Sequence, residues 1–153
     1  MNAIINLKTP SEDEFRTLLR KHNLKATRQR IAVHRVMTDL GHASADMVSE
    51  ELVRRGETRV TVASVYNILS QLADERIYTR RMSGNSKMYF DVNTSKHLHL
   101  YDRENNTYRD VYDEELMDLI RSRLKKRKFK GFTVEDIDIQ LIARPTKKTR
   151  LAL

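Results

Sequence analysis

The stretch KHLHLYDRENNTYRD, residues 96–110, holds the side chains whose types and spacing most directly suggest chemistry. His97 and His99 are two residues apart, so on a β-strand both imidazoles lie on one face of the sheet. A run of turn formers follows, and then Asp110. Two imidazoles and a carboxylate favour a divalent first-row metal such as Fe(II), Mn(II) or Zn(II). The plainer interpretation is an ordinary strand that carries histidines.

The turn residues predict a β-hairpin, and its register decides where the carboxylate lies. A hairpin centred on Glu104–Asn105 would pair His99 with Asp110. A hairpin centred on Asn105–Asn106 would pair His99 with Tyr112 instead. Asp110 shares the histidine face in both registers, because side chains alternate with a period of two. The sequence therefore predicts that the three groups converge.

Composition limits the classes of function. The 153 residues carry a formal net charge of +8, with +4 in residues 1–92 and +4 in residues 93–153. Such an evenly spread excess suits a polyanion partner such as nucleic acid. The chain has no cysteine, which excludes disulfides and cysteine-ligated metal sites. The start, MNAIINLKTP, lacks the apolar segment of a signal peptide, and no stretch resembles a membrane span, so we expect a cytoplasmic protein without a membrane partner.

The first half of the chain predicts helices and then a hairpin. Four helices each begin at a capping residue, namely Ser11, Thr27, Ser44 and Thr61, with Glu14 completing a capping box. On the fourth helix we expect the inward positions to be Val62, Val65, Leu69 and Leu72. The runs IYTRRM and KMYFDV around SGNS then predict a β-hairpin. This order is typical of a winged helix-turn-helix, in which the last helix enters the DNA major groove.

Polar side chains of the fourth helix lie off its apolar face, where base edges or solvent would meet them. Basic residues flank the same module. The candidate DNA-contacting residues are Lys25, Arg28, Thr61, Ser64, Tyr66 and Asn67.

The second half predicts a small α/β domain. We expect a DNA-binding domain at 1–92, a hinge at 93–96 and a second domain at 97–153. After the hairpin, a helix is predicted from about Asp113, with inward positions at Leu116, Leu119, Ile120 and Leu124. The final strand alternates at Ile137, Ile139, Leu141 and Ala143.

Several motifs together resemble the ferric uptake regulator (Fur) family of metal-responsive repressors. They are LKATRQR, HASADMV, TVASVYNILSQLADERI, MYFDV and HLH followed by Asp110. The resemblance covers nearly the whole chain. It implies an α+β fold, with an N-terminal winged helix-turn-helix followed by a small α/β dimerisation domain. It also implies a homodimer that binds a double-stranded operator, which we expect to be an A/T-rich inverted repeat.

The resemblance also implies a ligand set for one divalent metal per chain, between the two domains. The matching positions are His42, Asp91, His97, His99 and Asp110. Aspartates at both carboxylate positions are most similar to the peroxide-sensing branch of the family. A lysine at the position of Lys25 reaches the minor groove in the family, and residues at Tyr66 and Asn67 face bases. Asparagine pairs best with adenine, so Asn67 favours a shift in base preference where some members have arginine.

The chain departs from the family where many members hold a structural zinc. Asp102 and Asn105 occupy the positions of the Cys-x-x-Cys pair on the hairpin tip. A secondary histidine-and-glutamate site is also lost, because Met117 and Ile137 occupy its positions. We therefore expect no structural zinc, and a tip held by hairpin pairing and by packing of Tyr101 against Tyr108.

The prediction is a metal-dependent DNA-binding regulator whose hinge metal sets the geometry of a homodimer, in response to metal or peroxide. One alternative is a metal-independent winged-helix DNA-binding protein. Another is an oxygen-using iron enzyme with a two-histidine, one-carboxylate site. No second catalytic constellation is visible in the sequence, so we expect no enzymatic activity.

Overall fold

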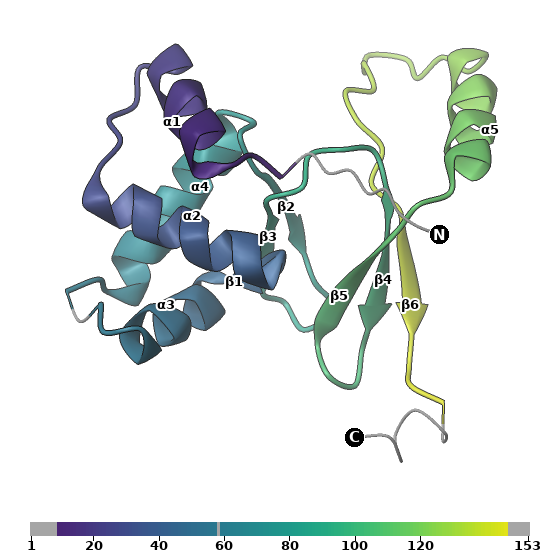
Figure 1. Ribbon diagram of the computed structural model, residues 1–153. Coiled ribbons are helices and arrows are strands. Elements are labelled where there is room, and N and C mark those ends of the chain that lie inside the picture. The colour runs from purple at the N-terminus through teal and green to yellow at the C-terminus, as the bar shows by residue number, and fades with distance from the viewer. Residues whose placement is uncertain (1–8, 58, 147–153) are drawn as a thin grey trace. The chain divides into compact units, whose positions relative to one another are not determined.

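The computed structural model describes residues 9–57 and 59–146 and contains two compact units, residues 1–95 and 96–153 (Figure 1). Each unit is described by itself. Residues 1–8 and 147–153, which begin and end the two predicted domains, lie outside the described residues. Within the described residues, none of the helices is both long enough and apolar enough to cross a bilayer.

Helices dominate the first unit. They are α1 (Glu12–Lys21), α2 (Arg28–Leu40), α3 (Ala45–Arg54) and α4 (Val62–Asp74). The four predicted caps are confirmed: the side chains of Ser11, Thr27, Ser44 and Thr61 each accept a hydrogen bond from the backbone N–H three residues later. These bonds satisfy donors that a helix leaves unpaired at its start.

A three-stranded antiparallel sheet completes the first unit. Its strands are β1 (His42–Ser44), β2 (Thr79–Met82) and β3 (Met88–Asp91), in the order β1-β3-β2. The hairpin of β2 and β3 is the predicted wing. Strand β1 was not predicted, because three residues are too few to show a period. It places His42 opposite Asp91 on β3.

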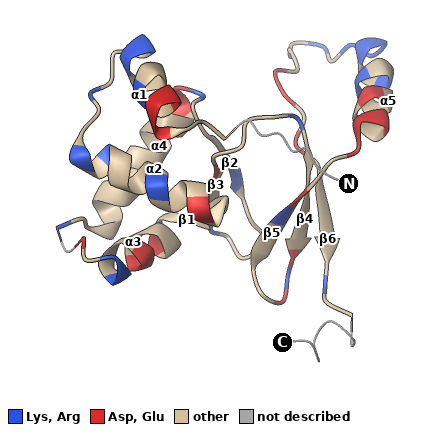
Figure 2. Ribbon diagram, viewed as in Figure 1, with Lys and Arg blue, Asp and Glu red and all other residues tan. Residues whose placement is uncertain are grey.

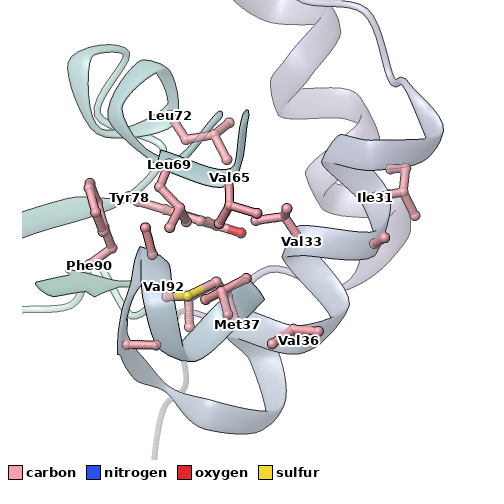
Figure 3. Close-up of a cluster of buried hydrophobic side chains, with 14 of the residues drawn as sticks. Ile31, Val33, Val36, Met37, Val65, Leu69, Leu72, Tyr78, Phe90 and Val92 are labelled. Carbon is pink, nitrogen blue, oxygen red and sulfur yellow. The ribbon is translucent and has the colours of Figure 1, made fainter. Parts of the chain in front are cut away.

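The core of the first unit lies between its helices and the sheet (Figure 3). Val33, Val65 and Leu69 are fully buried there. The expectation that Val62 faces inward was wrong, since its exposed fraction is 44%. Val62 is the first residue of α4, at the edge of the core.

The second unit is built on another three-stranded sheet. Its elements are β4 (Leu98–Asp102), β5 (Thr107–Val111), α5 (Glu114–Lys125) and β6 (Gln140–Ala143). The strand order is β5-β4-β6, with β4 antiparallel to β5 and parallel to β6. Together the two units confirm the predicted α+β class.

The β4–β5 hairpin has the first of the two predicted registers, with His99 paired to Asp110. Its tip is held by Asp102, whose Oδ1 accepts hydrogen bonds from the backbone N–H groups of Glu104 and Asn105. Tyr101 and Tyr108 pack with ring centroids 4.9 Å apart, as expected.

The inward face of α5 differs from the prediction. Met117 is its buried residue, whereas Leu116 and Leu119 are 37% and 61% exposed. Both leucines are therefore exposed in the part of the chain that the structure describes. The final strand is also shorter than predicted, and Leu141 is 44% exposed.

Candidate metal centre and nucleic-acid interface

In the first unit, one imidazole and one carboxylate meet at the end of the sheet. The pairing of β1 with β3 sets His42 directly against Asp91. His42 Nε2 lies 3.1 Å from Asp91 Oδ2, and the side chains are only 9% and 1% exposed. A charged group so deeply buried needs a partner of opposite charge, a hydrogen bond or a metal.

The backbone after β3 orients this carboxylate. The N–H of Asn93 donates to Asp91 Oδ1 over 2.8 Å. Asn93 is itself buried, and its Oδ1 accepts from the backbone N–H of Ser95 over 3.0 Å. The predicted hinge at 93–96 thus begins with hydrogen-bonded turns that fix one oxygen of Asp91.

In the second unit, β4 and β5 bring together two imidazoles and a carboxylate. His97, His99 and Asp110 each offer a ligand atom, and these atoms lie within 4.8 Å of one another. His97 Nε2 is 3.1 Å from Asp110 Oδ1, and the two imidazole centroids are 4.4 Å apart. Both histidine side chains are 3% exposed. Histidines so nearly buried need polar partners, and Asp110 provides one for His97.

Sequence reasoning missed one acidic neighbour of this cluster. Asp138 Oδ1 lies 3.5 Å from His99 Nδ1. Asp138 precedes β6 and is far from His99 in sequence, so only the parallel pairing of β4 with β6 brings them together.

The donors of both units suit a divalent metal. Each unit supplies imidazole nitrogen and carboxylate oxygen, and the chain has no thiolate. Fe(II), Mn(II) and Zn(II) accept this set, whereas metals that require several cysteines do not.

The exposed face of α4 carries two predicted DNA-contacting residues. Tyr66 is 45% exposed, and Asn67 is also exposed. The Tyr66 ring packs edge-on against Phe90 of the wing strand β3, with centroids 6.1 Å apart. A shallow hollow beside them is lined by Val62 and Lys87 as well. Asp46 also lines the hollow, 3.7 Å from Lys87 Nζ, so the face offers an aromatic ring, an amide and a partly neutralised cation to a ligand.

Thr61 and Ser64 have structural contacts at the start of α4. Thr61 Oγ1 accepts from the backbone N–H of Ser64 over 3.1 Å and donates to the Ser64 hydroxyl over 3.0 Å. These bonds occupy part of the capacity of both hydroxyls for contact with DNA.

Lys25 and Arg28 flank this helix from the start of α2, where Figure 2 shows basic residues. Both are exposed, and Arg28 lies 3.7 Å from Glu57. Arg30 joins the segment to α4: one nitrogen donates to the Lys25 carbonyl over 2.8 Å, and another donates to Gln71 over 2.6 Å. The structure thereby fixes the backbone of Lys25 against the proposed recognition helix.

Comparison with known proteins gives one consistent result. The model of the "Ferric uptake regulator family" matches residues 21–141. The ferric uptake regulation protein of Escherichia coli (strain K12) is 34% identical over 85 residues, which cover 54% of this chain and 56% of that protein. The chain thus spans about half the length of the curated relatives it matches.

Solved structures share the fold. The ferric uptake regulator of Vibrio cholerae superposes with a TM-score of 0.72 at 22% identity, over 86% of this chain and 99% of that one. The Campylobacter jejuni peroxide stress regulator gives a TM-score of 0.63 at 24% identity, over 86% and 96%.

Proposed function

Because the chain belongs to the ferric uptake regulator family, we propose that it is a metal-dependent, DNA-binding transcriptional repressor that acts as a homodimer. The observation that carries the proposal is the cluster of His97, His99 and Asp110. Their ligand atoms lie within 4.8 Å of one another, and two imidazoles with one carboxylate form a donor set that suits a divalent cation.

The proposed ligand set draws on both units. His42 and Asp91 belong to the DNA-binding unit, and the other three belong to the second unit. A divalent ion held by these five side chains would attract donors from both units. The five residues would then restrict the angle between the units, and in a homodimer they would set the spacing of two recognition helices against two half-sites. A differential affinity of a few kcal/mol for this state shifts the equilibrium strongly.

In the DNA-bound state, Tyr66 and Asn67 contact base edges in the major groove. Lys25 and Arg28 neutralise phosphates, and Thr61 and Ser64 contact the backbone from the start of α4. An A/T-rich inverted repeat is the proposed operator. A basic chain with a net charge of +8 supports the electrostatic part of this binding.

The sensed signal is proposed to be the level of iron or another divalent metal, or peroxide. Both carboxylates of the ligand set are aspartates, which favours the peroxide branch of the family. The peroxide stress regulator of Campylobacter jejuni shares the fold.

The test is DNA affinity at fixed salt, measured with metal-free protein and after addition of Mn(II), Fe(II) or Zn(II). We expect metal to strengthen specific binding. Equal affinity in all samples would favour the metal-independent winged-helix alternative. Absence of substrate turnover by the Fe(II)-loaded protein would count against the iron enzyme.

A further inference from the structure

We propose that Asp138 is a positioning residue of the metal centre. Its carboxylate accepts a hydrogen bond from the Nδ1–H of His99, which leaves Nε2 as the ligand atom of that histidine. The inference rests on the proposed function, because it concerns the same site. It assigns a role to a residue outside the five proposed ligands.

The chemistry of the two groups decides which of them donates. Asp138 Oδ1 lies 3.5 Å from His99 Nδ1. An ionised carboxylate only accepts hydrogen bonds, so the nitrogen that faces it carries the proton. A neutral imidazole protonated at Nδ1 has its lone pair at Nε2. The contact therefore selects the tautomer that binds metal through Nε2.

The backbone places Asp138 beside the imidazole. The backbone N–H of His99 donates to the carbonyl of Ile139 over 3.0 Å, and His99 is paired with Gln140 across β4 and β6. Asp138 immediately precedes Ile139, so strand pairing brings its short side chain to the histidine. The position follows from the sheet, not from a long flexible side chain.

The second oxygen of Asp138 has its own partner. Gln140 Nε2 donates to Asp138 Oδ2 over 3.5 Å, and Tyr108 OH donates to Gln140 Oε1 over 3.3 Å. The Tyr108 ring also packs edge-on against the His99 ring, with centroids 6.1 Å apart. A closed path of contacts through Tyr108, Gln140 and Asp138 thus returns to His99 and restrains the orientation of the carboxylate.

Carboxylates in this position are a general feature of histidine metal ligands. The nitrogen that does not bind the metal usually donates to a carboxylate or carbonyl, which fixes the ring and raises its basicity. Loss of such a partner weakens metal binding by about tenfold to a hundredfold.

The first experiment compares Asp138→Ala and Asp138→Asn with a matched control, Asp136→Ala. Asp136 lies on the same segment but bonds to Lys96 Nζ over 2.9 Å. Mn(II) is titrated into the full metal-free chain, and free Mn(II) is measured by electron paramagnetic resonance. We expect Asp138→Ala to raise the Mn(II) dissociation constant by about tenfold to a hundredfold. Asp138→Asn keeps an accepting oxygen and should lose less, while Asp136→Ala should match the wild type.

The second experiment reads the tautomer of His99 without metal, through long-range 1H–15N correlations of the imidazole. The wild type and Asp136→Ala should show Nδ1–H, and Asp138→Ala should shift toward Nε2–H. Thermal unfolding followed by circular dichroism checks that all variants are folded. An Nε2–H tautomer in the wild type, or unchanged tautomer and Mn(II) affinity in Asp138→Ala, would overturn the assignment. If the wild type binds no Mn(II), the proposed function fails, and the tautomer still decides the role of Asp138.

Discussion

His99 and Asp110 occupy directly opposed positions on β4 and β5, so the hairpin register itself sets an imidazole against a carboxylate. His97 shares their face, and its Nε2 lies 3.1 Å from Asp110 Oδ1. The hairpin is closed by backbone pairing and by its own turn, so this part of the site is positioned by the fold. Metal removal should therefore affect binding more than structure.

Chelation should lower DNA affinity while the fold and the dimer persist. The expected loss is about 5- to 150-fold, the usual range for coupling between two binding sites. Replacement of both His97 and His99 by Ala should reproduce it. Affinity, circular dichroism and sedimentation are measured before and after chelator, and metal content is measured by elemental analysis. Collapse of the dimer or loss of helix signal would mean that the metal is structural.

Tyr66→Ala or Asn67→Ala should reduce sequence discrimination more than total affinity. Each side chain is exposed on α4, where truncation should remove the proposed base contact and leave the proposed phosphate contacts in place. The ratio of affinities for a site selected in vitro and for random DNA measures this effect. Wild-type affinity should also fall steeply as salt rises. Full discrimination by both variants would refute the assignment of the recognition helix.

Substitutions at Thr61 can separate its capping role from a DNA contact. Thr61→Ala should cost about 1 kcal/mol of unfolding free energy, because the hydroxyl caps α4. Thr61→Asp should restore the cap but repel phosphate. Urea denaturation and DNA titration of both variants are compared. A Thr61→Asp protein with wild-type DNA affinity would limit Thr61 to the structural role.

Acid should destabilise the first unit through His34. The ring is 2% exposed, stacks on Phe15 with centroids 3.9 Å apart, and contacts the Pro10 carbonyl at 2.9 Å and Tyr78 OH at 2.7 Å. Burial lowers the pKa of His34 below its ordinary value of 6.5, against the opposing hydrogen bond to Pro10. The unfolded chain therefore takes up this proton at higher pH than the folded chain does. Unfolding free energy should fall as pH drops below about 6.5.

Urea denaturation at several pH values measures this slope. His34→Leu should remove the contribution of the imidazole to it. Tyr78→Phe keeps the buried imidazole and removes only its hydroxyl partner at 2.7 Å, so a slope of the same sign should remain. An unchanged slope in His34→Leu would show that other groups cause the acid sensitivity.

Peroxide should leave a chemical trace if the protein senses it. Fe(II)-loaded protein treated with hydrogen peroxide should gain one oxygen on His42 or His97, as read by peptide mass spectrometry. Mn(II)-loaded protein is the control, because it should resist this oxidation. An unmodified Fe(II) sample that still represses would leave metal level as the signal.

The fold was predictable where local signals were strong. Ser11, Thr27 and Thr61 marked helix starts, since a capping side chain acts within three residues. The sequence left two hairpin registers open. Both registers place Asp110 on the face of the sheet that carries the histidines. In the observed register, Asp102 accepts hydrogen bonds from two backbone N–H groups of the turn. These bonds depend on the backbone geometry of the turn, which the sequence alone does not give.

Long-range pairing was the part that the sequence did not reveal. Asp138 meets His99 through a parallel strand pair, and no local spacing encodes that partner. Leu119 was predicted to be buried but is exposed. The spacing of apolar residues along α5 predicts an apolar face, but it does not say whether the surface that covers this face belongs to the same chain. The ligand set of five residues stays a prediction.

The hairpin tip has a consequence for the conditions under which this protein keeps its shape. Asp102 accepts from two backbone N–H groups and from the Asn105 amide, and that amide holds the pKa of Asp102 below its ordinary value. A turn closed in this way contains no thiol that an oxidant can attack, and we expect it to need no ion that starvation can withdraw. Oxidative stress and zinc scarcity, which would open a cysteine clasp, should leave this turn intact down to acidic pH.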